Sequence, residues 1–152
     1  MRRLKIGGKF EVGQRFGGSG SNRSDHHASE RLAEFGLDAL RTHRAYTLSG
    51  GERRRVEIAR SLVVSPDFLL LDEPFAGIDP LAVLEIQGIA RRLASTGIGV
   101  LVTDHNVRET LSIVDRAYII NAGEILRAGT PLALSSDAVV KKIYLGEAFQ
   151  LN

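Results

Sequence analysis

Residues 66–74 read Pro-Asp-Phe-Leu-Leu-Leu-Asp-Glu-Pro, and this stretch decides the fold. Four consecutive apolar residues, 68–71, lie between a Pro-Asp pair and the acidic pair Asp72-Glu73. A short apolar run bounded by turn-forming residues is typical of a parallel strand that is buried on both faces. The sequence therefore predicts an inner strand whose carboxyl end carries two carboxylates.

A helix and a second apolar run follow this strand. Pro80 is favoured in the first turn of a helix, and apolar residues at helical spacing continue to about Ala94. Gly97 ends that helix, and residues 98–102 form a second buried strand. The order strand, helix, strand predicts a right-handed βαβ unit with parallel strands. Ligands bind at the carboxyl ends of the strands in such sheets.

Other elements are predicted on both sides of this unit. Before it, residues 28–40 form a weak amphipathic helix and residues 51–64 a stronger one that Pro66 ends. After it come a short helix, a β-hairpin and a last helix. They cover residues 107–114, 117–127 with a turn at Asn121-Ala122-Gly123, and 131–145 before Gly146.

Composition excludes several classes of protein. The 152 residues contain no cysteine, so disulfides, thiolate metal sites and a cysteine nucleophile are ruled out. No apolar run approaches the ~18 residues of a membrane span. Residues 1–27 contain six Lys or Arg and two Asp or Glu. Residues 28–152 therefore contain the other 14 Lys or Arg and the other 16 Asp or Glu. We interpret residues 1–27, which are also rich in glycine, as a flexible basic leader and residues 28–152 as the folded part.

The first chemical motif is Leu-Ser-Gly-Gly-Glu at 48–52, which opens the helix expected over 51–64. Ser49 can cap this helix, and the glycines Gly50 and Gly51 let another molecule approach the backbone N–H groups. The N-terminus of a helix is a ready anion site. The pentapeptide alone leaves a second interpretation open, a serine-capped helix with a solvated basic face.

The second motif is the acidic pair. Asp72 could hold Mg²⁺, which prefers few carboxylates together with water and phosphate oxygens. Glu73 could orient and polarise an attacking water. The alternative is an acidic strand end that only caps the next turn.

Two more motifs follow at the predicted ligand edge. Asp79, in Gly-Ile-Asp-Pro at 77–80, stands where the N-cap of the next helix is expected. Thr-Asp-His-Asn at 103–106 follows the second strand, on the same sheet edge as Glu73. His105 could there contact the γ-phosphate of a nucleotide.

The four motifs together, in this order and spacing, resemble the nucleotide-binding subunits of ABC transporters over about residues 24–150. Residues 48–52 match the family's signature motif, ending in Glu where Gln is commoner. Residues 69–73 match Walker B, residues 77–80 the D-loop, and His105 the switch histidine. Residues 48–61, 103–111 and 143–151 look most like one branch, the ATPase of lipopolysaccharide exporters. The ATPases of branched-chain amino-acid importers are the second choice.

The family's phosphate loop, Gly-x-x-x-x-Gly-Lys-Ser/Thr, is not recognisable. Residues 17–24 have Asn22 in place of the second glycine and Arg23 in place of the lysine, and no apolar strand precedes them. We therefore expect a partial P-loop NTPase fold of the ABC ATPase type. It is an α/β fold with a parallel sheet, flanking helices and a C-terminal β-hairpin, and without the N-terminal half. Apolar faces of the sheet would then be bare, which predicts marginal stability or aggregation of the chain alone.

The resemblance implies an ATP-binding and ATP-hydrolysing subunit that uses ATP and Mg²⁺. In the family, two subunits dimerise and hold ATP between the phosphate loop of one and the signature motif of the other. Transmembrane transporter subunits are the further partners, and the location is the cytoplasmic side of the inner membrane. By this resemblance the catalytic residues are Glu73 and His105, the metal ligand is Asp72, and the nucleotide-binding residues are Ser49, Gly50, Gly51, Glu52 and Asp79.

Two other functions stay open from the sequence. Nucleic-acid-associated ATPases share the signature and Walker B motifs, and the basic residues 1–27 and 53–55 could suit them. However, none of the nine aromatic residues interleaves with basic ones as a stacking platform would, so we expect no nucleic-acid partner. The chain could also be an inactive truncation product, and whether it hydrolyses ATP alone is left open.

Overall fold

The computed structural model describes residues 32–146, and the predicted leader lies outside this range. The chain divides into two compact units, Met1–Val64 and Ser65–Asn152. Within residues 32–146, no helix is long and apolar enough to cross a membrane.

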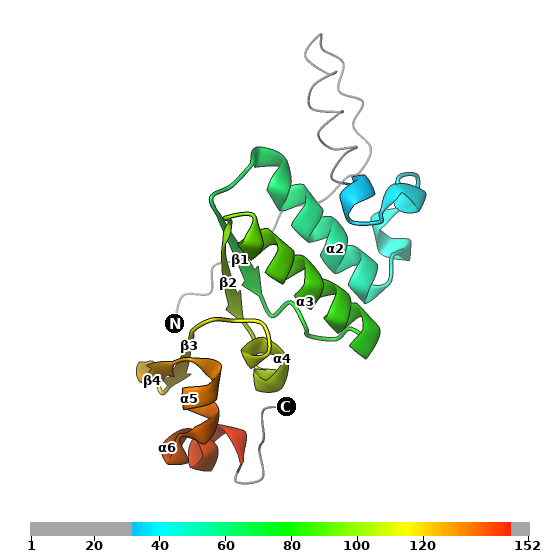
Figure 1. The fold of residues 1–152 in the computed structure, drawn as a ribbon. Coiled ribbons are helices and arrows are strands. Elements are labelled where there is room, and N and C mark those ends of the chain that lie inside the picture. The colour runs from blue at the N-terminus through cyan, green and yellow to red at the C-terminus, as the bar shows by residue number, and fades with distance from the viewer. Residues whose placement is uncertain (1–31, 147–152) are drawn as a thin grey trace. The chain divides into compact units, whose positions relative to one another are not determined.

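The first unit is built on helix α2, Gly50–Ser61, which continues into a 3₁₀ turn at Leu62–Val64 (Figure 1). Before α2 lie two more 3₁₀ turns, Asp38–Leu40 and Ala45–Thr47. The prediction of a single helix over 28–40 is wrong for the residues described, because α-helix covers only 32–34 and a turn separates it from the 3₁₀ turn at Asp38–Leu40. Gly36 takes a φ of +65°, a left-handed conformation that ends a helix.

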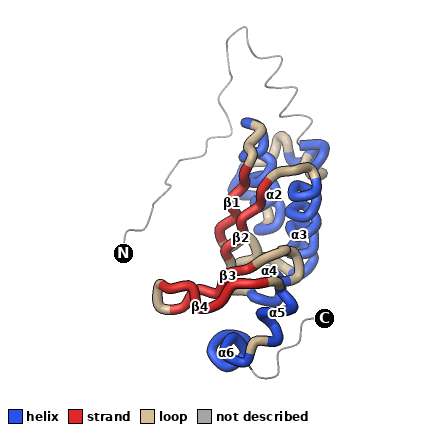
Figure 2. Tube along the Cα trace, turned by 60° about the vertical axis from the view of Figure 1, so that its left-hand side comes forward, coloured by secondary structure: helices blue, strands red, loops and turns tan. Residues whose placement is uncertain are grey.

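The second unit begins with the βαβ arrangement that the sequence predicts. Strand β1, Phe68–Asp72, and strand β2, Gly99–Thr103, pair in parallel and are joined by helix α3, Pro80–Ser95. Figures 1 and 2 show α3 beside the two strands. The register places Asp72 opposite Thr103, so the carboxyl ends of both strands meet at one edge.

The prediction that β1 is buried on both faces is wrong, and so is the prediction that β2 is a buried strand. Leu69 and Leu71 are buried, whereas Phe68 and Leu70 on the opposite face are 73% and 70% exposed. Leu101 of β2, which pairs with Leu70, is 56% exposed. We call Phe68, Leu70 and Leu101 the open face. The apolar run at 68–71 suits a strand covered twice, but no described residue covers its second face.

The rest of the second unit surrounds a small core of its own. It contains α4 (Val107–Leu111), β3 (Ala117–Asn121), β4 (Glu124–Gly129), α5 (Pro131–Ser136) and α6 (Ala138–Val140). Strands β3 and β4 form the predicted hairpin, seen side by side in Figure 2. Both turn residues, Ala122 and Gly123, have positive φ, as a type I′ turn requires. The shared core consists of Leu111, Ile119, Leu134 and Val140.

The single helix expected over 131–145 is divided. Asp137 adopts an extended conformation, with φ −68° and ψ 124°, and this ends α5. Its carboxylate accepts hydrogen bonds from the N–H groups of Val139 and Val140 and so caps α6. A π-helical turn, Lys141–Leu145, follows and ends at Gly146, as expected.

Candidate nucleotide site

The N-terminus of α2 has the geometry of a complete capping box. The Ser49 hydroxyl oxygen accepts a hydrogen bond from the Glu52 N–H at 3.2 Å. In return, the Glu52 carboxylate accepts one from the Ser49 N–H at 2.8 Å. The capping interpretation of Ser49 is therefore confirmed. It is compatible with an anion site, because a hydroxyl that accepts from the Glu52 N–H can turn its one proton from the Glu52 carboxylate to a bound anion.

The glycines Gly50 and Gly51 form the first turn of this 12-residue helix. N–H groups in the first turn have no partner within the helix, and the helix dipole is positive at that end. Ser49 and Gly50 are exposed, whereas Gly51 is buried. An anion can therefore approach the helix at its Ser49–Gly50 end.

The capping box predicts a pH dependence of stability. The pKa of Glu52 lies below its ordinary value of 4.5. The hydrogen bond from the Ser49 backbone N–H lowers this pKa most, and the hydrogen bond with the Ser49 side chain lowers it further. A carboxyl group whose pKa is lowered by folding stabilises the protein at pH values above the pKa that the group has in the unfolded chain. This stabilisation is lost as the pH falls through the pKa of the group in the folded protein. In Glu52→Gln the capping box is kept but nothing titrates. We expect the thermal midpoint of the wild type to fall relative to that of Glu52→Gln below about pH 4.5. A constant difference from pH 7 to pH 3 would contradict this.

In the second unit, the carboxyl ends of β1 and β2 are joined by two hydrogen bonds. The Thr103 hydroxyl donates to the Asp72 carboxylate at 2.6 Å. The N–H of Glu73 donates to the carbonyl oxygen of Thr103, also at 2.6 Å. These contacts fix the acidic strand end against its neighbour, so the direction in which Asp72 and Glu73 leave β1 is determined.

Glu73 and His105 lie together at this edge. The His105 Nδ1 atom is 3.9 Å from the Glu73 Oε1 atom, and the two side chains are 71% and 60% exposed. Glu73 has a φ of +47°, which is unusual for a residue other than glycine and often marks a functional site. The structure thus brings both predicted catalytic residues to one solvent-accessible place.

Asp104 is a residue of this edge to which the sequence assigned no role. Its side chain is completely buried. One carboxylate oxygen accepts a hydrogen bond from the Phe75 N–H at 3.0 Å and the other from the Asn106 N–H at 2.8 Å. The bond to Asn106, two residues on, is a local turn that an aspartate before a helix signals. The bond to Phe75 spans 29 residues and has no signal in the sequence.

Asp79 is the N-cap of α3, as predicted. Its carboxylate accepts hydrogen bonds from the N–H groups of Leu81 and Ala82, at 3.1 and 3.0 Å. Gly77 in the preceding turn has a φ of +68°, which favours glycine. These bonds explain why an aspartate stands here, whether or not it also contacts a nucleotide.

The residues present fit Mg²⁺ only in part. Among the residues that the structure describes, no group of three or more His, Asp or Glu side chains could hold a metal ion. Asp72 offers one carboxylate at the exposed end of β1. Mg²⁺ commonly takes one or two carboxylates and completes its shell with water and substrate phosphates. Asp72 therefore suits a metal that arrives with a nucleotide.

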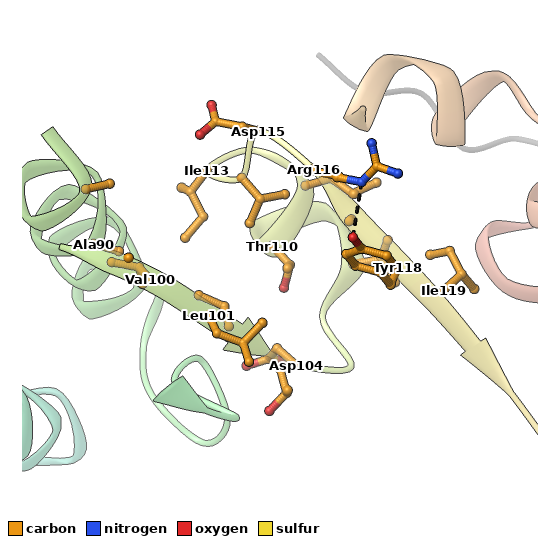
Figure 3. Close-up of a pocket in the computed structure, with 18 of the residues that line it drawn as sticks. Ala90, Val100, Leu101, Asp104, Thr110, Ile113, Asp115, Arg116, Tyr118 and Ile119 are labelled. Atoms are coloured by element: carbon orange, nitrogen blue, oxygen red, sulfur yellow. Dashed lines mark hydrogen bonds between the residues drawn. The ribbon is translucent and has the colours of Figure 1, made fainter. Parts of the chain in front are cut away.

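A cavity of about 880 Å³ runs along β2 (Figure 3). Its walls come from α3, β2, α4 and β3, with Leu101 on one side and Tyr118 on the other. The Arg116 Nε atom donates to the Tyr118 hydroxyl at 3.3 Å. Thr103 and Asp104 line the cavity, but Glu73 and His105 do not. The predicted catalytic residues therefore lie at the sheet edge and outside this mostly apolar hollow.

Known proteins are similar to the chain in sequence and in fold. The family described as ABC transporter matches residues 4–76, which include most of the predicted leader. The lipopolysaccharide export system ATP-binding protein LptB of Acidithiobacillus ferridurans is 60% identical over 120 residues, 79% of this chain and 50% of the relative. LptB of Escherichia coli K12 is 52% identical over 133 residues, 88% of this chain and 55% of the relative.

Solved structures agree with the sequence relatives. An ATP-binding cassette of an ABC transporter in its ADP conformation has a TM-score of 0.76 at 30% identity, over 84% of this chain and 52% of that one. The chain spans about half the length of the curated relatives that it matches. The α/β fold with a parallel strand pair and a hairpin is confirmed, and the chain belongs to the ATP-binding proteins of ABC transporters.

Proposed function

We propose that this chain is part of the ATPase that powers an ABC transporter, and that the transporter exports lipopolysaccharide. The observation that carries the proposal is the exposed, serine-capped N-terminus of α2, which offers a hydroxyl and backbone N–H groups to an anion. The transported substrate is inferred from the two relatives at 60% and 52% identity, both named for lipopolysaccharide export.

The γ-phosphate of ATP is the anion that suits this helix end. Ser49 would donate its hydroxyl proton to a phosphate oxygen while still accepting from Glu52. Gly50 and Gly51 would allow the phosphate close to the backbone. Because the sequence has no recognisable phosphate loop, we propose that a partner subunit's loop holds this ATP and that the α2 N-terminus closes over it.

The β1–β2 edge supplies the groups for hydrolysis. Glu73 would orient the attacking water, and His105, 3.9 Å away, would contact the γ-phosphate. Asp72 would hold a water that is bound to Mg²⁺. Asp79 would hold the turn before α3, which in the proposed dimer faces the second subunit. When bound, Mg²⁺ neutralises charge on the phosphates. These residues act only on ATP that a phosphate loop brings to the same edge.

The partners follow from this division of the site. A second ATPase subunit with a phosphate loop completes the nucleotide site. ATP hydrolysis at that site drives the transmembrane subunits. The proposed location is the cytoplasmic side of the inner membrane, where ATP and the membrane subunits are both within reach. No nucleic acid is required at any step.

The proposal is tested by complementation. The chain alone should show no ATP turnover above background. We then mix it with E. coli LptB whose own signature serine is replaced by arginine, a variant in which neither site of the homodimer is complete. Adding the chain should restore ATP hydrolysis, because α2 offers an intact signature to the relative's phosphate loop. Failure to restore turnover, although the two proteins co-purify, would identify the chain as inactive. Turnover by the chain alone that disappears in Glu73→Gln would contradict the first expectation.

A further inference from the structure

We propose that Asp104 is a positioning residue, whose buried carboxylate joins the turn after β1 to the turn after β2 and so holds Glu73 beside His105. The proposal concerns the same site and rests on the proposed function for the roles of Glu73 and His105. The geometry behind it, however, can be measured without any nucleotide.

The first step is the burial of a charged group. The Asp104 side chain has no exposed surface, although a carboxylate that is fully buried needs partners to offset its lost hydration. It has two backbone partners, the Phe75 N–H at 3.0 Å and the Asn106 N–H at 2.8 Å. Figure 3 shows Asp104 just beyond the carboxyl end of β2. The two partners belong to different turns, so one side chain connects both.

The second step is the conformation of Glu73. Its φ of +47° is unfavourable for a residue with a side chain. Pro74, the next residue, further restricts the backbone of Glu73. Such a conformation persists only when its surroundings impose it. Before the strained residue, the Glu73 N–H donates to the Thr103 carbonyl at 2.6 Å. After it, the Phe75 N–H donates to Asp104. The strained residue is thus fixed on both sides.

The third step is what the fixed turn achieves. His105 directly follows Asp104. The His105 Nδ1 atom is 3.7 Å from the Asp104 Oδ1 atom and 3.9 Å from the Glu73 Oε1 atom. If the Phe75 bond is lost, the turn can relax to an ordinary backbone conformation and carry the Glu73 carboxylate away from His105. A purely local role, capping the turn that leads into α4, explains the bond to Asn106 but not the bond to Phe75.

Hydrogen exchange on the full chain tests the proposal. Asp104→Asn keeps the shape, but one end of an amide donates, so it cannot accept from both N–H groups. The matched control is Asp137→Asn in the same unit, because both of its backbone partners bond to one oxygen, Oδ1, which an amide retains. We expect Asp104→Asn to speed exchange in peptides covering 73–77 by about tenfold or more. Exchange in the β3–β4 hairpin should stay unchanged. The control should keep the cap at 138–140 and leave exchange at 73–77 unchanged, although it loses the Oδ2 contact to Arg127.

A second measurement separates positioning from general stability. Glycine adopts positive φ without cost, so Glu73→Gly removes the strain that Asp104 is proposed to hold. The urea midpoint should therefore fall more when Asp104→Asn is made in the Glu73→Gly background than in the wild type, because only in the wild type does relaxation of the turn release strain that offsets the lost hydrogen bond. An equal fall in both backgrounds, exchange that rises uniformly through the second unit, or unchanged exchange at 73–77 would each overturn the proposal. None of these results bears on the complementation, so the two failures are distinguishable.

Discussion

Replacing Ser49 with aspartate should lower the ATP turnover that the chain restores to the signature-deficient relative by roughly 10²-fold or more. The same substitution should leave the stability of α2 almost unchanged, because aspartate is as good an N-cap as serine. Its carboxylate can accept the Glu52 N–H as the Ser49 hydroxyl does, at 3.2 Å in the wild type. What changes is the charge that faces the phosphate, and a negative group there repels it and has no proton to donate.

Two further substitutions at this position serve as controls. Ser49→Ala removes the cap as well as the donor and should cost about 1 kcal/mol of unfolding free energy, measured from urea midpoints. Ser49→Thr keeps both the acceptor and the donor and should retain most of the turnover. Steady-state ATPase rates of the mixed assembly check the set. Full turnover with aspartate would show that Ser49 is only a helix cap and would remove the main support for the proposed nucleotide contact.

The sequence predicts the features that depend on near neighbours. Ser49 and Glu52 lie one helical turn apart, so the capping box could be expected from their spacing alone. The βαβ unit follows in the same way from two apolar runs and the helix between them. Asp137 shows the limit, because an apolar pattern that continues through 131–145 hides the residue whose extended backbone divides the helix.

Features that depend on distant residues could not be predicted. The bond from Phe75 to Asp104 joins positions 29 apart, and nothing in either motif indicates that they meet. The apolar run at 68–71 likewise indicates a strand suited to burial on both faces. Whether each face is buried depends on which other segments pack against it. Local signals thus located the site, whereas the contacts that hold it together became visible only in three dimensions.

Making the open face polar should increase the fraction of the chain that stays monomeric. In the double variant Leu70→Thr and Leu101→Thr, two paired residues that are 70% and 56% exposed lose their apolar surface. Threonine retains a good β propensity, so the unfolding free energy should change by no more than about 0.5 kcal/mol per site. Sedimentation velocity and light scattering at increasing concentration measure the expected fall in aggregates, and urea unfolding measures the stability.

The matched control is the neighbouring position on the covered face. Leu69 is 5% exposed, and Leu69→Ala should cost about 2–5 kcal/mol because it leaves a cavity in the core. That is a large part of the ~5–15 kcal/mol that holds an ordinary domain together. Adjacent leucines of one strand should therefore respond in opposite ways, one governing association and the other stability. If Leu70→Thr costs as much stability as Leu69→Ala, or if the wild type stays monomeric at every concentration tested, the open face is not bare. The expected aggregation would then have no physical basis.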